Sequence, residues 1–108
     1  MLVLFDHVTP APLSAHLIGQ VIVKAKDRGW DRLTNGDLLT AAEKAGFEVL
    51  ITADNNMRYQ QNLAGRGIAL VVLSSPQWPR VRTCVAAIDA TVNAATPGSY
   101  AEVNIPYE

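Results

Sequence analysis

Short apolar runs that alternate with segments of helical spacing constrain this fold more than any other feature of the sequence. The runs are mainly aliphatic and cover residues 2–5, 21–25, 47–52 and 68–73. Such runs are typical of buried strands. Strands that alternate with helices form βαβ units, which predict a mainly parallel sheet covered on both faces. We therefore expect an α/β fold.

The segments between the apolar runs predict the helices. Helices are expected over residues 13–18, 37–45, 55–64 and 81–95. Gly46 and Gly65 follow two of them as C-terminal stops. The last helix is expected to be long and amphipathic, because apolar residues recur in it at three- and four-residue steps. Residues 29–37 are expected to form a loop or a loose turn.

Length and composition indicate one folded domain. The chain has 108 residues, of which 49% are hydrophobic and 18% charged, and this excludes a disordered chain. We place the domain at residues 1–96 and treat residues 97–108 as a tail that is either a last edge strand or an arm. The formal net charge of −1 argues against a strong, sequence-blind grip on nucleic acid. It is compatible with an enzyme that contacts nucleic acid briefly through a few cations.

Cysteine usage and the N-terminal residues indicate the compartment. Cys84 is the single cysteine and cannot form an internal disulfide, which fits a reducing cytosol. No Cys/His spacing suits zinc. The start, MLVLFDH, does not resemble a signal peptide, and no apolar stretch approaches the roughly 20 residues of a membrane span. We expect a soluble, cytoplasmic protein without a membrane partner.

Three carboxylates are expected at one edge of the sheet. Asp6 closes the first strand, Asp54 follows the third strand, and Asp37 opens the helix between them. Ligands of open α/β sheets bind beyond the carboxyl ends of the strands. Clustered carboxylates repel one another, so a cation would stabilise them. Hard oxygen ligands favour Mg²⁺ or Mn²⁺, which can polarise a phosphodiester and orient an attacking water.

Helix capping is the alternative explanation for two of these acids. Asp54 can serve only as an N-cap, and Asp37 can serve only to complement a helix dipole, with Asn35 and Gly36 making the turn before it. Asp6 is harder to explain in this way, because Thr9 and Pro10 offer a helix start of their own.

Other polar residues give weaker signals. Arg58, Asn62 and Arg66 recur at four-residue steps and could share a substrate-binding helix face, although a solvated face is the commoner explanation. His7 and His16 have no recognisable partner motif. The sequence contains no GxSxG, GxxxxGK[ST] or GxGxxG motif.

Three stretches together resemble the small bacterial PIN-like proteins. They read LVLFDHVTPAPL, LTNGDLLTAAEKAGFEVLITADNNMRYQQNL and IALVVLSSPQWP, and the similarity covers about residues 2–95. This uncharacterised family is related to the PIN-domain ribonucleases, which include toxins of toxin–antitoxin modules. The resemblance implies a three-layer α/β/α sandwich with a mainly parallel sheet of four to five strands. It also implies an acidic pocket for Mg²⁺ or Mn²⁺.

The resemblance also implies particular site residues. The first-strand acid falls on Asp6, the helix acid on Asp37, where the family often has Glu, and the acid of the Thr-x-Asp motif on Asp54. These three would be catalytic and would bind the metal. Active PIN nucleases usually carry a further acid where this chain has Asn56, a neutral oxygen ligand that leaves the site with one negative charge fewer. Arg58 and Asn62 would bind substrate.

We therefore expect a Mg²⁺- or Mn²⁺-dependent ribonuclease with RNA as substrate. The toxin of a toxin–antitoxin module, with a small antitoxin protein as its partner, would be one form of this function. The alternative, favoured by Asn56 and the mildly acidic charge, is a catalytically weak or inactive PIN-like module that binds or regulates a protein or nucleotide. A homodimer formed through residues 81–95 or through the tail is compatible with both.

Overall fold

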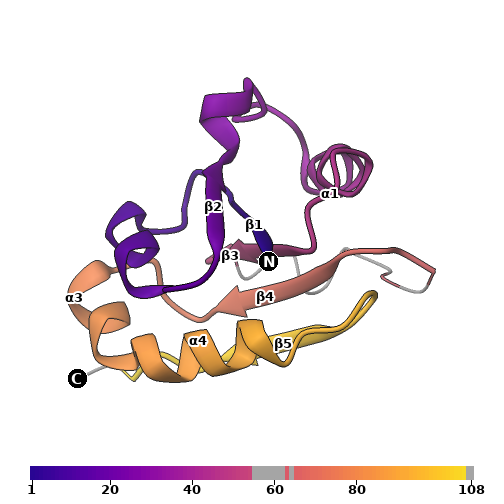
Figure 1. The fold of residues 1–108 in the computed structure, drawn as a ribbon. Coiled ribbons are helices and arrows are strands. Elements are labelled where there is room, and N and C mark those ends of the chain that lie inside the picture. The colour runs from indigo at the N-terminus through magenta and orange to yellow at the C-terminus, as the bar shows by residue number, and fades with distance from the viewer. Residues whose placement is uncertain (55–62, 64, 107–108) are drawn as a thin grey trace.

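All strands of the described part of the chain run parallel in one sheet. The computed structural model describes residues 1–54, 63 and 65–106. The strands are β1 (Leu2–Phe5), β2 (Val21–Lys24), β3 (Val49–Thr52), β4 (Ala69–Leu73) and β5 (Tyr100–Val103). Their order in this five-stranded sheet is β2-β1-β3-β4-β5, so the first strand lies inside the sheet and later strands form its edges (Figure 1).

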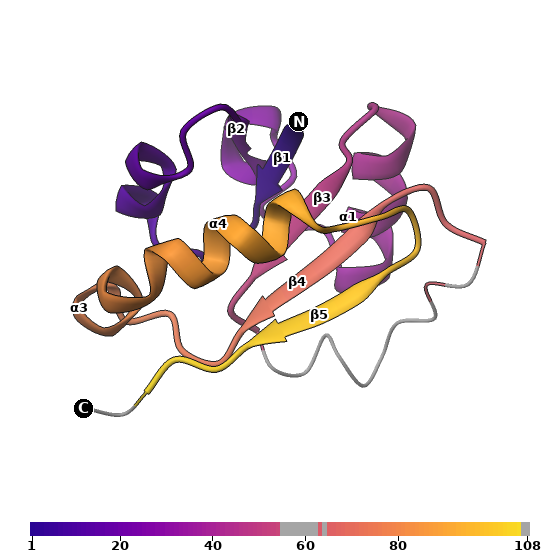
Figure 2. The ribbon, with the colours of Figure 1, turned by 60° about the horizontal axis from the view of Figure 1, so that its bottom comes forward.

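Helices cover both faces of the sheet. They are η1 (Ala11–His16), η2 (Ala25–Arg28), α1 (Asn35–Lys44), α3 (Trp78–Val81), η3 (Arg82–Cys84) and α4 (Val85–Asn93), where η marks a 3₁₀ helix. Figure 2 shows α3 and α4 lying across one face, with α1 behind the other. The expected three-layer α/β/α sandwich with a parallel sheet is thereby confirmed.

Successive residues of the central strands pack into two separate cores. In β4, Val71 belongs to the same core as Leu13 of η1 and Ile88 of α4, whereas Leu70 belongs to the core that contains Leu39 of α1. All residues of β3 and β4 are buried. A parallel strand that is covered on both faces reads as a continuous apolar run, and this explains why the sequence predicts these strands well. The predicted strands at residues 47–52 and 68–73 each begin slightly later in the structure, at Val49 and Ala69.

The start of α1 differs from the expectation. The helix begins at Asn35, with Thr34 in extended conformation as its N-cap, so Asn35 and Gly36 belong to the first turn of the helix and do not form a separate turn before it. Asp37 consequently lies inside the first turn. The loop predicted at residues 29–37 is shorter for the same reason. Gly46 follows the helix with a φ of +90°, as a C-terminal stop requires.

The helix predicted over residues 13–18 is a 3₁₀ helix that begins and ends earlier. Pro10 is its N-cap and Pro12 lies in its first turn. Proline has no N–H and a fixed φ, so it suits the start of a helix but not its interior.

The long helix predicted over residues 81–95 is divided into three helical segments. It begins at Trp78 as α3, tightens into η3 and continues as α4. The hydroxyl of Thr83 donates a 2.7 Å hydrogen bond to the carbonyl oxygen of Arg80. A side chain that bonds to the preceding turn competes with the regular helical hydrogen bonds, which accounts for the change of pitch here.

The tail forms an edge strand. β5 pairs in parallel with β4, and Val103 and Ile105 are buried in the core that α4 covers. The side-chain hydroxyl of Ser74 accepts a 2.7 Å hydrogen bond from the amide of Ile105. Of the two alternatives for this segment, the strand is therefore the one that the structure contains.

The helix expected over residues 55–64 lies outside the described residues, apart from Leu63, which is buried against the α1 side of the sheet. Among the described residues, no helix has the length and apolar character needed to cross a membrane.

Candidate functional site

The carboxyl ends of β1 and β3 lie side by side and bring Asp6 and Asp54 to one edge. These strands are parallel neighbours, with Phe5 opposite Ile51. The amide of Asp6 continues the pairing and donates a 3.3 Å hydrogen bond to the carbonyl oxygen of Ile51. The condition on which the sequence argument depended, that the first and third strands are neighbours, is therefore met.

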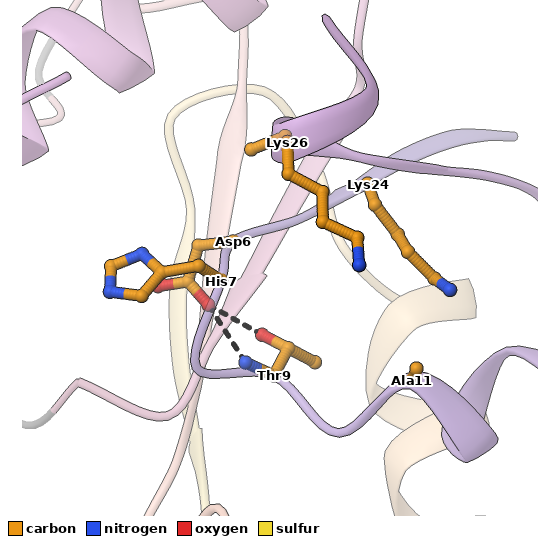
Figure 3. Close-up of a pocket in the computed structure, with 7 residues that line it drawn as sticks. Asp6, His7, Thr9, Ala11, Lys24 and Lys26 are labelled. Atoms are coloured by element: carbon orange, nitrogen blue, oxygen red, sulfur yellow. Dashed lines mark hydrogen bonds between the residues drawn. The ribbon is translucent and has the colours of Figure 1, made fainter. Parts of the chain in front are cut away.

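Asp6 is held in place by the turn that follows it. Its side chain is almost completely buried, at 6% exposure. The oxygen Oδ1 accepts hydrogen bonds from the amides of Val8 (3.2 Å) and Thr9 (3.1 Å) and from the Thr9 hydroxyl (2.7 Å). The Thr9 hydroxyl also lies 2.7 Å from the carbonyl oxygen of Ile51, which ties the turn to β3. Figure 3 shows the two hydrogen bonds that Thr9 donates to Asp6, from its amide and from its hydroxyl.

Thr52 connects the two carboxylate residues. It is the last residue of β3 and has no exposed surface. Its hydroxyl donates to Oδ2 of Asp6 and accepts a 3.0 Å hydrogen bond from the amide of Asp54. The resemblance included Thr52 only as part of a Thr-x-Asp motif, and no role followed from it. The signal in the sequence that points to Thr52 is its hydroxyl at the end of an otherwise apolar strand.

Burial controls the ionisation of Asp6. Removal from water raises the pKa of the Asp6 carboxyl above its ordinary value of 3.8, because the charged form loses hydration. Hydrogen bonds from Thr52 and Thr9 and the charge of His7 lower this pKa, but burial is the larger effect. The hydrogen bonds and the charge of His7 therefore do not fully compensate the carboxylate charge of Asp6, and a cation bound there would stabilise it further.

A small pocket opens beside Asp6. It has a volume of about 100 Å³ and is lined by Asp6, His7, Thr9, Ala11, Lys24, Ala25 and Lys26 (Figure 3). Lys24 is the last residue of β2 and Lys26 belongs to η2. Neither lysine was predicted as a site residue, because Lys24 lies inside the predicted strand at residues 21–25, Lys26 follows it, and no motif includes them.

Asp37 is placed differently from the other two acids. It is exposed in the first turn of α1, where a carboxylate complements the helix dipole. Among residues 1–54, 63 and 65–106, no group of three or more His, Cys, Asp or Glu side chains is arranged to hold a metal ion. Within this part of the chain, the closely linked pair is Asp6 and Asp54, joined through Thr52.

The remaining predicted residues divide into two groups. Asn56, Arg58 and Asn62 lie outside the described residues. Arg66 lies near α1, where its guanidinium is 3.3 Å from Oε1 of Glu43 and donates to the Thr40 hydroxyl over 3.2 Å. Arg66 therefore connects the segment before β4 to α1.

The donor set at Asp6 fits a hard divalent cation. A carboxylate offers about four lone-pair positions. Oδ1 accepts hydrogen bonds from three groups, whereas Oδ2 accepts one, from Thr52. Oδ2 therefore retains capacity for one further partner. Mg²⁺ and Mn²⁺ prefer oxygen ligands of this type and keep several waters.

The fold and this edge define an α/β protein with an all-parallel sheet and a polar site at the carboxyl ends of its strands. Comparisons with protein-family models, with curated proteins and with solved structures found no match.

Proposed function

We propose that this protein is a metal-dependent ribonuclease of the PIN-like type, with Mg²⁺ or Mn²⁺ bound by Asp6 and Asp54. The observation that carries the proposal is the connection of Asp6 and Asp54 through the Thr52 hydroxyl at the ends of neighbouring parallel strands. Asp37, at the start of α1, is the third acid of the proposed site, and Asn56 is a neutral oxygen ligand. RNA is the proposed substrate, and Arg58 and Asn62 are proposed to contact it.

Each residue of the described site has a distinct role in this proposal. A bound divalent ion would polarise the scissile phosphodiester and lower the pKa of a bound water. Thr9 and the amide of Val8 fix one oxygen of Asp6, and the Thr52 hydroxyl donates to the other. Thr52 sets the backbone of Asp54 relative to Asp6. Burial of Asp6 removes competing water, which strengthens its interaction with a cation.

Calorimetry with Mn²⁺ tests the metal site. The wild type should bind Mn²⁺, and Asp6→Asn and Asp54→Asn should each abolish the binding. Glu48→Gln is the matched control, since it removes the same charge from an exposed residue just before β3, at the opposite end of that strand. Absence of any divalent ion binding at millimolar concentration would overturn the proposed function.

Cleavage of single-stranded RNA tests the activity. Wild-type protein with Mn²⁺ should cleave the RNA, and Asp54→Ala should not. Metal binding without cleavage would favour the second candidate, a PIN-like binding or regulatory module. The specific observation in its favour is that hydrogen bonds from the protein itself already occupy much of the Asp6 carboxylate.

The biological setting is also a proposal. A ribonuclease toxin would require an antitoxin partner, and a small gene immediately beside this one would support that assignment. PIN-like proteins commonly form homodimers, so we propose a homodimer as well. A strictly monomeric mass in solution at high protein concentration would contradict the dimer.

A further inference from the structure

The pocket beside Asp6 carries two lysines that the proposed metal site does not use. Phe5 of β1 pairs with Lys24 of β2, so Lys24 lies next to the residue that precedes Asp6. Lys26 follows in η2. In Figure 3 both lysine side chains extend toward the turn that carries Thr9 and Ala11. We call this the lysine pocket.

The lysine pocket is lined by two lysines and by one acid, Asp6. Neither Lys24 nor Lys26 forms an ion pair with a carboxylate among residues 1–54, 63 and 65–106. Two ammonium groups that line one small pocket repel each other, and an anion between them removes that repulsion. Lysine is a common phosphate ligand and acts as a compact point charge.

The size of the pocket limits what can bind there. Its volume is about 100 Å³. Pockets that enclose drug-sized ligands measure roughly 300–1,000 Å³. The lysine pocket is therefore large enough for one small anionic group but too small to enclose a base together with its sugar. A phosphate group has the matching charge and size.

We propose that the lysine pocket binds a phosphate group of the RNA substrate, next to the phosphate that is cleaved. The inference rests on the proposed function, since it takes RNA as the substrate. Asp6 lines the same pocket and belongs to the proposed metal site, so a backbone phosphate held by the lysines lies beside the metal. The lysines thereby select a polyanionic chain and set its position along the sheet edge.

Binding without cleavage provides the first test. Protein in EDTA is titrated with a short single-stranded RNA, followed by fluorescence anisotropy, and with inorganic phosphate, followed by calorimetry. Lys24→Ala and Lys26→Ala should each weaken RNA binding by about fivefold, the upper value for one exposed ion pair. Each should also reduce the slope of log affinity against log salt by about 0.7, as expected for the loss of one phosphate contact on a single strand.

Matched variants separate a phosphate contact from general effects of charge or folding. Lys44→Ala removes the same charge at the exposed end of α1 and should leave the salt slope unchanged. Lys24→Arg and Lys26→Arg keep the charge and should retain most of the affinity. Thermal unfolding of all variants checks that they are folded.

The outcomes distinguish the two proposals. Lysine-dependent binding of RNA and phosphate by a protein that cleaves nothing supports the lysine pocket as an RNA-phosphate site and overturns the ribonuclease, together with the position of the pocket next to a cleaved phosphate. Cleavage with a KM that is unchanged in both alanine variants overturns the lysine pocket and leaves the ribonuclease standing. Binding of inorganic phosphate without binding of RNA also overturns the lysine pocket as a substrate site.

Discussion

Asp6 combines two opposing effects within one side chain. Its carboxylate is fixed by hydrogen bonds from Val8, Thr9 and Thr52, which stabilise the charged form. Burial of the same group destabilises the charged form and has the larger effect on its pKa. A buried acid in this condition is a candidate functional residue.

The raised pKa predicts how stability depends on pH. Between 3.8 and the higher pKa of the folded state, the folded protein binds more protons at Asp6 than the unfolded chain does. The contribution of this group to the free energy of unfolding is therefore fully present below pH 3.8 and is lost as pH rises through the folded pKa. Urea unfolding over a series of pH values, in metal-free buffer, should show this loss in the wild type relative to Asp6→Asn. A difference between the two proteins that does not change with pH would contradict the prediction.

Thr52→Val tests the connection between Asp6 and Asp54. Valine keeps the shape of the side chain but removes the hydroxyl, so Asp6 loses a donor and the amide of Asp54 loses an acceptor. We expect the free energy of unfolding to fall by about 1–3 kcal/mol, the cost of leaving buried polar groups unpaired. Urea unfolding measures this change.

Thr52→Ser is the control for the connection. Serine keeps the hydroxyl and removes only a methyl group. If the hydroxyl supports the proposed metal site, Thr52→Val should lower the Mn²⁺ affinity and Thr52→Ser should retain it. Equal loss of Mn²⁺ affinity in both variants would show that the packing of the methyl group, and not the hydroxyl, is what matters at this position.

At the level of elements, the buried strands are the part of the structure that the sequence predicts best. β3 and β4 are covered on both faces, and so their apolar runs are uninterrupted. Helix starts are harder to predict, because they depend on capping and on single hydrogen bonds. Thr34 occupies the N-cap position of α1 without a side-chain capping hydrogen bond, and the Thr83 hydroxyl coincides with the division of the last helix. Composition and periodicity contain neither signal.

Gly98 makes the turn that brings β5 to the sheet. Its φ is +78°, and an added Cβ would lie 3.2 Å from the carbonyl oxygen of Leu63 and 3.3 Å from that of Arg66. Gly98→Ala should therefore destabilise the protein by more than the roughly 1–2 kcal/mol that left-handed backbone costs an ordinary residue.

Gly46→Ala is the comparison for this prediction. Gly46 also has a positive φ, of +90°, but an added Cβ would meet no atom within 4 Å. The difference between the two variants in urea unfolding isolates the cost of the close approach at Gly98. Equal destabilisation of the two variants would mean that the Leu63 and Arg66 carbonyls move aside without cost.

At the scale of the whole molecule, strand order decides which predicted residues meet. The sequence marks Asp6 and Asp54 as residues that end strands, but it does not say that β1 lies between β2 and β3. This order places Asp54 on one side of Asp6 and Lys24 on the other. Lys24 and Thr52 were missed because their importance arises from neighbouring strands and not from a local motif. Asn56, Arg58 and Asn62 stay predictions.

The same arrangement would make the proposed metal binding a property of the folded chain. Asp6 and Asp54 are far apart in sequence and come together only when β1 pairs with β3. An ion that binds the folded state alone stabilises it by mass action, by about 2.7 kcal/mol at a free concentration 100 times the Kd. Thermal unfolding with and without Mn²⁺ should show this gain in the wild type and in Glu48→Gln, and not in Asp6→Asn or Asp54→Asn. An equal gain in all four proteins would place the ion elsewhere, because removal of either carboxylate would then leave its binding intact.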